Sequence, residues 1–171
     1  CEYGKMSDHT WLNHLRKLGV LGTPHPGSRL EKSCNWIDSI RKISPDSAPF
    51  SRLGKIRSCG VTDMRYGNVV DDDWKGRDRF EFSGDQRIPV PLPKHVQCYS
   101  IAATTGKESN KLGDDLIGDG LVTLPSALGR HRNSELNLSF PETHQWVGRN
   151  MKHMDLLSHP EVYETIKNWL R

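Results

Sequence analysis

We predict an α/β fold for this chain, with a parallel sheet whose strands are joined by helical crossovers. Apolar runs that end in turn residues alternate with segments of helical periodicity. Residues 95–103 form a nearly continuous apolar run, which is typical of a strand buried on both faces. We find only about three such strands, and a sheet of that size leaves an unpaired edge that proteins avoid. We therefore interpret the chain as the C-terminal half of a larger domain.

The N-terminal elements follow from the positions of turn residues. Residues 1–16 predict the end of a helix, its exit loop and a short helical turn. The apolar run at 17–23 is closed by Pro24 and Gly27 and predicts the first strand. A helix with one apolar face is expected over residues 28–43, because a capping-box pair opens it and apolar residues recur every three or four positions.

Residues 44–94 differ from both flanks, because prolines, glycines and mixed charges dominate them. So long a stretch between elements is usually a functional insertion such as a lid. Short strands at 55–59 and 79–82 could pair as a hairpin within it. The run Asp71 to Asp73 favours a solvated loop, because it lacks the ligand spacing of a calcium loop. Five apolar residues suit either a lid over an acyl pocket or a small packed subdomain: Trp74, Phe80, Phe82, Val90 and Leu92.

The C-terminal part continues the alternation of strands and helices. A short helix is expected at 121–128 and another strand within 136–147. The closing helix is expected at 161–170, with Ser158 as N-cap and Pro160 in the first turn, where proline is tolerated. Its inward residues are expected to be Val162, Ile166, Trp169 and Leu170.

Composition excludes several classes of protein. The net charge of +3 is scattered and is not clustered with stacking aromatics, so we expect no nucleic-acid partner. No apolar run approaches the ~18 residues of a membrane-spanning helix. None of the four cysteines forms a Cys-x-x-Cys pair, so a zinc knuckle is not expected. Reduced thiols are favoured, with Cys98 buried in a strand, and a cytoplasmic location is slightly favoured.

Two residues are candidates for acid–base chemistry. Asp119 lies between glycines after the strand at 95–103, and His153 follows the last expected strand. Strands of a parallel sheet bring such loops to one edge. A hydroxyl nucleophile needs a neutral imidazole to take its proton, and a carboxylate must hold that imidazole in one tautomer. Taken alone, each motif is also compatible with an ordinary turn.

Three motifs in order carry a family resemblance: Leu21-Gly-Thr-Pro-His-Pro-Gly27, Gly118-Asp-Gly-Leu-Val122 with Pro125-Ser-Ala-Leu128, and His153-Met-Asp-Leu-Leu-Ser-His-Pro-Glu-Val162. With them the chain resembles the C-terminal part of an α/β-hydrolase, in the bacterial lipase and esterase group that includes triacylglycerol-lipase-like and inositol-deacylase-like proteins. The resemblance covers residues 1–43 and 95–171 and places a variable lid at 44–94.

The resemblance implies a catalytic role for two residues. Asp119 would be the triad acid and His153 the triad histidine of a serine carboxylic-ester hydrolase. The substrate would be an ester or acyl lipid, no cofactor would be needed, and the lid could contact a membrane surface.

The nucleophile of such an enzyme is missing from the sequence. No serine stands in the Gly-x-Ser-x-Gly elbow that this mechanism requires. The resemblance places that elbow shortly upstream of Cys1. Two interpretations stay open: a portion of an ester hydrolase, or an inactive binding or interaction module. An unpaired sheet edge predicts self-association or pairing with the N-terminal part.

Other histidines have simpler interpretations. His25 is expected to fix a proline-framed turn, with a direct catalytic role as the alternative. His159 is expected to support the site or cap the closing helix. A metal site from His153, Asp155 and His159 is not expected, because it needs three or four ligands that converge in a set geometry.

Overall fold

The computed structural model describes residues 1–27, 62–78, 84–106 and 118–171. It divides the chain into two compact units, one of Cys1–His25 with Pro89–Arg171 and the other of Pro26–Ile88. The second unit contains most of the expected insertion. The expected helix at 28–43 lies outside the described residues, as do the proposed hairpin strands at 55–59 and 79–82.

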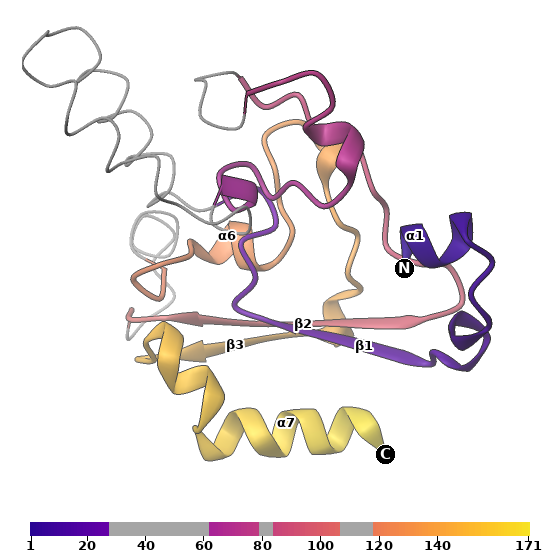
Figure 1. The fold of residues 1–171 in the computed structure, drawn as a ribbon. Coiled ribbons are helices and arrows are strands. Elements are labelled where there is room, and N and C mark those ends of the chain that lie inside the picture. Colours follow the sequence, from indigo (N-terminus) through magenta and orange to yellow (C-terminus); the bar gives the residue numbers. More distant parts are fainter. Residues whose placement is uncertain (28–61, 79–83, 107–117) are drawn as a thin grey trace, which may run out of the picture. The chain divides into compact units, whose positions relative to one another are not determined.

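The first unit is built on a three-stranded parallel sheet with strand order β1-β2-β3 (Figure 1). The strands are β1 (Lys17–Leu21), β2 (Gln97–Thr104) and β3 (Gln145–Arg149). β2 is central and buried from its second residue onward, which confirms the prediction of a strand covered on both faces. A parallel sheet with flanking helices is thus an α/β arrangement, as the sequence predicted.

A short helix and a turn precede the sheet. α1 (Glu2–Met6) and the 3₁₀ turn η1 (Thr10–His14) agree with the helix end and helical turn expected from the first residues. Gly4 of α1 is buried, and a Cβ there would lie 2.9 Å from a methyl carbon of Leu12. The glycine therefore allows α1 to pack closely on the chain that follows it.

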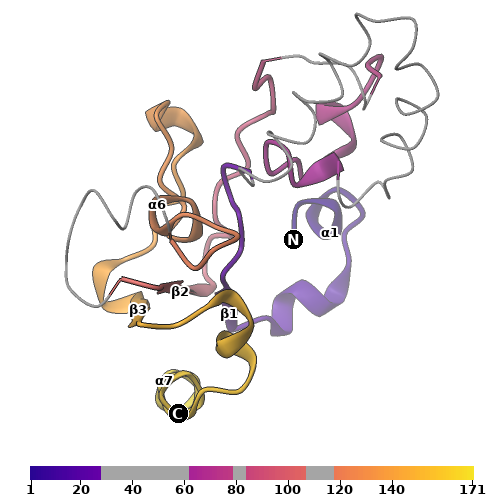
Figure 2. The same ribbon diagram turned by 90° about the vertical axis from the view of Figure 1, so that its left-hand side faces the viewer.

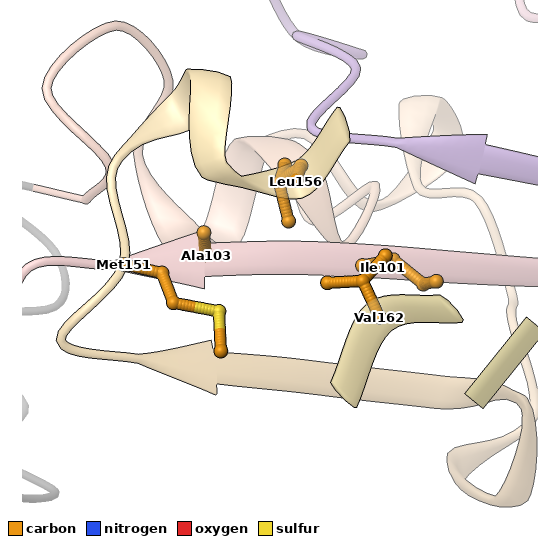
Figure 3. Packing of buried hydrophobic residues seen from close by; sticks show 5 residues of the cluster. All are labelled: Ile101, Ala103, Met151, Leu156 and Val162. Atoms are coloured by element: carbon orange, nitrogen blue, oxygen red, sulfur yellow. The ribbon is translucent and has the colours of Figure 1, made fainter. Parts of the chain in front are cut away.

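The first face of the sheet is covered by the C-terminal segments. Side chains alternate along a strand, so Ile101 and Ala103 of β2 share this face. They pack with three buried residues from the segments after β3, namely Met151, Leu156 and Val162 (Figure 3). Leu156 belongs to the 3₁₀ helix η6 (His153–Leu157) and Val162 to α7 (Pro160–Leu170).

The opposite face carries a smaller cluster. Ala102 packs there with Val122, Ala127 and Leu128, and the short helix α6 (Leu124–Ala127) covers this side (Figure 2). Buried Ser100 lies on the same face and donates a hydrogen bond from Oγ to the Ala127 carbonyl at 2.8 Å. Both faces of β2 are therefore closed by segments that follow it in the chain.

The third strand is shorter than the sequence predicted. The expected strand within 136–147 begins only at Gln145, because two 3₁₀ turns precede it, η4 (Ser134–Leu136) and η5 (Glu142–His144). Pro141 precedes the second turn, and a proline has no N–H to contribute to a sheet. The helix expected at 121–128 is likewise reduced to α6.

The closing helix agrees with its prediction except at two positions. Pro160 occupies the first turn as expected, but the N-cap is His159 rather than Ser158, since its Nδ1 accepts from the Glu161 amide at 3.3 Å. Val162 belongs to the core, and the partly buried Ile166 and Trp169 pack against it, as expected. Leu170 was wrongly expected inside, because it is 64% exposed. It lies about 80° around the helix from Val162.

The second unit shows a buried carboxylate. Asp73 ends the 3₁₀ turn η3 (Asp71–Asp73) and is only 2% exposed. It accepts hydrogen bonds from the backbone amides of Val69, Val70 and Ile88 at 2.8–3.1 Å. The expectation of a solvated loop is therefore wrong for this aspartate, which joins its own turn to Ile88.

Candidate active site

The candidate residues meet at the carboxyl edge of the sheet. Gly118 lies at the end of β2, where the Thr105 amide donates to its carbonyl at 2.8 Å. The segment after β3 reaches the same place, since the His153 amide donates to the Asp119 carbonyl at 3.2 Å. This edge is where α/β proteins build their sites, because loops from several strands converge there.

The side chains of these two residues form a hydrogen-bonded pair. His153 Nδ1 lies 2.7 Å from Asp119 Oδ2. The aspartate side chain has no exposed area, while 29% of the histidine side chain is exposed. The short distance is that of a charge-assisted hydrogen bond. Nδ1 is thereby used as a donor, and Nε2 of the neutral ring is the nitrogen that can accept a proton.

Asp119 is fixed by the backbone of its own loop. Its Oδ1 accepts from the amides of Leu121 and Val122 at 3.0 and 2.8 Å. The Asp119 amide donates to the Val122 carbonyl at 3.1 Å, so the turn is closed in both directions. Gly118 has a φ of 55°, and a Cβ there would lie 2.0 Å from the Val122 oxygen. The glycine is therefore required by the turn that aims the carboxylate.

His153 is fixed from both sides of its segment. Before it, Asn150 adopts a φ of 54° and the Met151 amide donates to the Thr104 carbonyl at 3.0 Å. After it, Asp155 Oδ2 accepts from the Lys152 amide at 2.8 Å, and Leu156 is buried in the core. The histidine thus opens a capped turn that is anchored to the end of β2.

Sequence reasoning missed one residue of this site. Gly22 directly follows β1, has a φ of 57° and lies against the His153 ring. The sequence placed it within the apolar run at 17–23 that predicts the first strand, with no role of its own. Its proximity to a histidine far along the chain depends on the strand order, which the sequence did not specify.

The remaining candidates have structural roles. The His25 ring packs on Phe140 with ring centroids 5.6 Å apart, and its amide donates to the Thr23 carbonyl at 2.9 Å. His159 caps α7, which was one of its two expected roles. Asp155 caps η6. In the described part of the chain, no three His, Cys, Asp or Glu side chains are grouped so that they could hold a metal ion.

Two polar strand residues are unsuited to act as the nucleophile. Ser100 is fully buried and its hydroxyl is used by the Ala127 carbonyl. Cys98 is a buried free thiol, and burial raises its pKa, so little thiolate forms at neutral pH. Cys1 is also free and is exposed, while Cys34 and Cys59 lie outside the described residues.

Comparison with known proteins adds no family. No protein-family model matches the chain, and no curated protein or solved structure is significantly similar to it. The class that the fold and site define is an α/β domain with a buried carboxylate–histidine pair at its sheet edge. Among the described residues, no helix has both the length and the apolar character needed to cross a bilayer.

Proposed function

We propose that this chain is the C-terminal portion of a serine carboxylic-ester hydrolase of the α/β-hydrolase type. The observation that carries the proposal is the 2.7 Å contact between the buried Asp119 carboxylate and Nδ1 of the partly exposed His153. A carboxylate placed in this way fixes the tautomer of the imidazole and stabilises the imidazolium that forms during catalysis. Part of the His153 side chain remains exposed, and a catalytic base has to be within reach of its substrate.

The proposed mechanism uses a serine supplied from outside these residues. Its hydroxyl oxygen attacks the acyl carbonyl carbon while His153 Nε2 takes the hydroxyl proton. The imidazolium then gives this proton to the leaving alkoxide as the ester bond breaks, and an acyl-enzyme remains. Water attacks the acyl-enzyme with the same proton transfers and releases the acid. No step requires a cofactor.

The substrate class is proposed from the surroundings of the pair. Three apolar side chains close to it in sequence are largely exposed: Leu121 at 44%, Met154 at 64% and Leu157 at 74%. Apolar surface of this kind suits an acyl chain, since its burial is worth about 25 cal/mol per Å². Residues 44–94 would supply a lid over such a substrate, and the lid could contact a membrane surface.

An inactive binding module is the alternative function. In that case the pair would serve only to give the buried Asp119 carboxylate its hydrogen-bond partners. The exposed fraction of the His153 ring favours the enzyme instead.

A fluorophosphonate probe tests the proposal directly, because it labels only an activated serine. We expect the protein extended upstream to be labelled on a serine that precedes Cys1. His153→Ala should slow labelling by up to about 10⁶-fold, which is the loss in kcat expected when a catalytic histidine is removed. His14→Ala is the control, because His14 is an exposed histidine outside the pair. Absence of labelling in the extended protein, or equal rates in both variants, would favour the binding module.

A further inference from the structure

The end of β1 approaches the candidate histidine more closely than any side chain would allow. Gly22 is buried, and its amide donates to the Ile101 carbonyl at 2.8 Å. A Cβ at this position would lie 2.8 Å from Cε1 and 3.0 Å from Nδ1 of His153. It would also lie 2.8 Å from a methyl carbon of Leu156. The backbone at the end of β1 therefore lies against the ring of His153, which follows β3.

The groups around Gly22 differ in how far they can move to make room for a side chain. Leu156 is 3% exposed and packed in the core cluster, so it has little room to move. Gly22 itself is tied to β2 by its amide. The His153 side chain is 29% exposed, so it is the less confined of the two side chains that a Cβ at position 22 would meet. A side chain at position 22 would therefore displace the ring of His153.

The size of that displacement can be compared with the tolerance of the hydrogen bond. Carbon atoms in favourable contact are about 3.5–4.0 Å apart, so relieving a 2.8 Å approach needs a shift of at least about 0.7 Å. Good N–H···O bonds span only about 0.5 Å in length, so a shift of this size, where it is directed away from Asp119, would lengthen the 2.7 Å Nδ1 to Oδ2 distance to about 3.4 Å and break the bond. Asp119 cannot follow the ring, because its other oxygen is held by two amides.

We propose that Gly22 is a positioning residue, whose lack of a side chain lets the His153 ring sit against the end of β1 with Nδ1 in reach of Asp119. The catalytic meaning of this role rests on the proposed function. The geometry does not, so it can be tested in the chain itself. All three strand ends would then contribute to the site: β2 the acid, β3 the histidine and β1 the space for its ring.

The test is the Nδ1 proton resonance of His153, observed by NMR in the 171-residue chain labelled with ¹⁵N-histidine. A proton shared with a carboxylate resonates far downfield, and the ring nitrogen shifts report the tautomer. Asp119→Asn should remove the signal, and Gly22→Ala should remove it as well. Gly76→Ala should keep it, because Gly76 has a comparable φ of 74° but open space around its Cβ position. This control shows whether an alanine in a left-handed position remote from the pair is enough to remove the signal.

A double-mutant cycle covers the case in which Gly22→Ala does not fold. Removing the imidazole removes the steric clash between a Cβ at position 22 and the His153 ring. Gly22→Ala should therefore lower the midpoint of thermal unfolding less in a His153→Ala background than in the parent chain. Equal losses in the two backgrounds, or a double variant that is also unfolded, would overturn the positioning role, because strain or Leu156 alone would then explain the cost.

The outcomes separate the two proposals. If Asp119→Asn leaves the downfield signal unchanged, the carboxylate–histidine pair is refuted, and with it the proposed function and the role of Gly22. If Asp119→Asn removes the signal while Gly22→Ala retains it, only the role of Gly22 is overturned. If both remove it and Gly76→Ala does not, Gly22 positions the histidine whether or not the protein hydrolyses esters.

Discussion

Replacing Asp119 in two ways measures what the buried carboxylate does for stability. Asp119→Ala leaves the amides of Leu121 and Val122 without their acceptor, and each buried unsatisfied group costs about 1–3 kcal/mol. Adding the lost bond to His153, and allowing for some relaxation of the loop, we expect a loss of about 3–5 kcal/mol in the free energy of unfolding. Asp119→Asn keeps an oxygen for both amides.

The asparagine variant should therefore be the milder one. Its amide group faces His153 Nδ1 and weakens only the charge-assisted bond, so we expect a loss of about 1–2 kcal/mol. Urea unfolding followed by circular dichroism measures both values, with exposed Asp72→Ala as a control that should change stability by less than about 0.5 kcal/mol. Equal losses for the alanine and asparagine variants would refute the role of the two backbone bonds. Losses as small as the control's would refute the buried loop altogether.

Further predictions concern the core and the thiols. Leu156→Ala should lower the free energy of unfolding by about 2–5 kcal/mol in a urea titration, because it leaves a cavity under η6. Leu170→Ala, on the exposed side of α7, should change this free energy by less than about 0.5 kcal/mol. A larger effect at Leu170 than at Leu156 would contradict the packing. Ser100→Ala should cost about 1 kcal/mol, since one buried hydrogen bond is lost, and an unchanged denaturation midpoint would count against that bond. Iodoacetamide should modify Cys1 before Cys98 in the native chain, as followed by peptide mass mapping. The rate at Cys98 should rise only toward alkaline pH, because burial raises the pKa of this thiol. Faster modification of Cys98 than of Cys1 near neutral pH would contradict its burial.

The spacing of apolar residues and the position of proline were enough to predict β2 and α7. β2 could be identified because an apolar run with little alternation has to be covered on both faces. α7 could be identified because Pro160 fixes its start and its apolar residues keep a helical spacing. The start of β3 could not, since apolar residues before Pro141 imitate a strand although the chain turns there.

The acid–histidine pair was predictable for a topological reason. Both residues follow strands, and loops after parallel strands reach one edge, so Asp119 and His153 could be expected to meet. Two features of long range could not be predicted. Asp73 is buried by backbone amides that are supplied by tertiary structure, and Gly22 meets His153 only because β1 and β2 are neighbours.

The most direct test of the central claim is the rate of p-nitrophenyl ester hydrolysis by the protein extended upstream of Cys1, beside its His153→Ala and Asp119→Asn variants. The account predicts an active parent, with kcat reduced by about 10⁶-fold in the first variant and about 10⁴-fold in the second. An extended protein without activity, or one whose variants hydrolyse the ester at the parent rate, would contradict the assignment of Asp119 and His153 to catalysis.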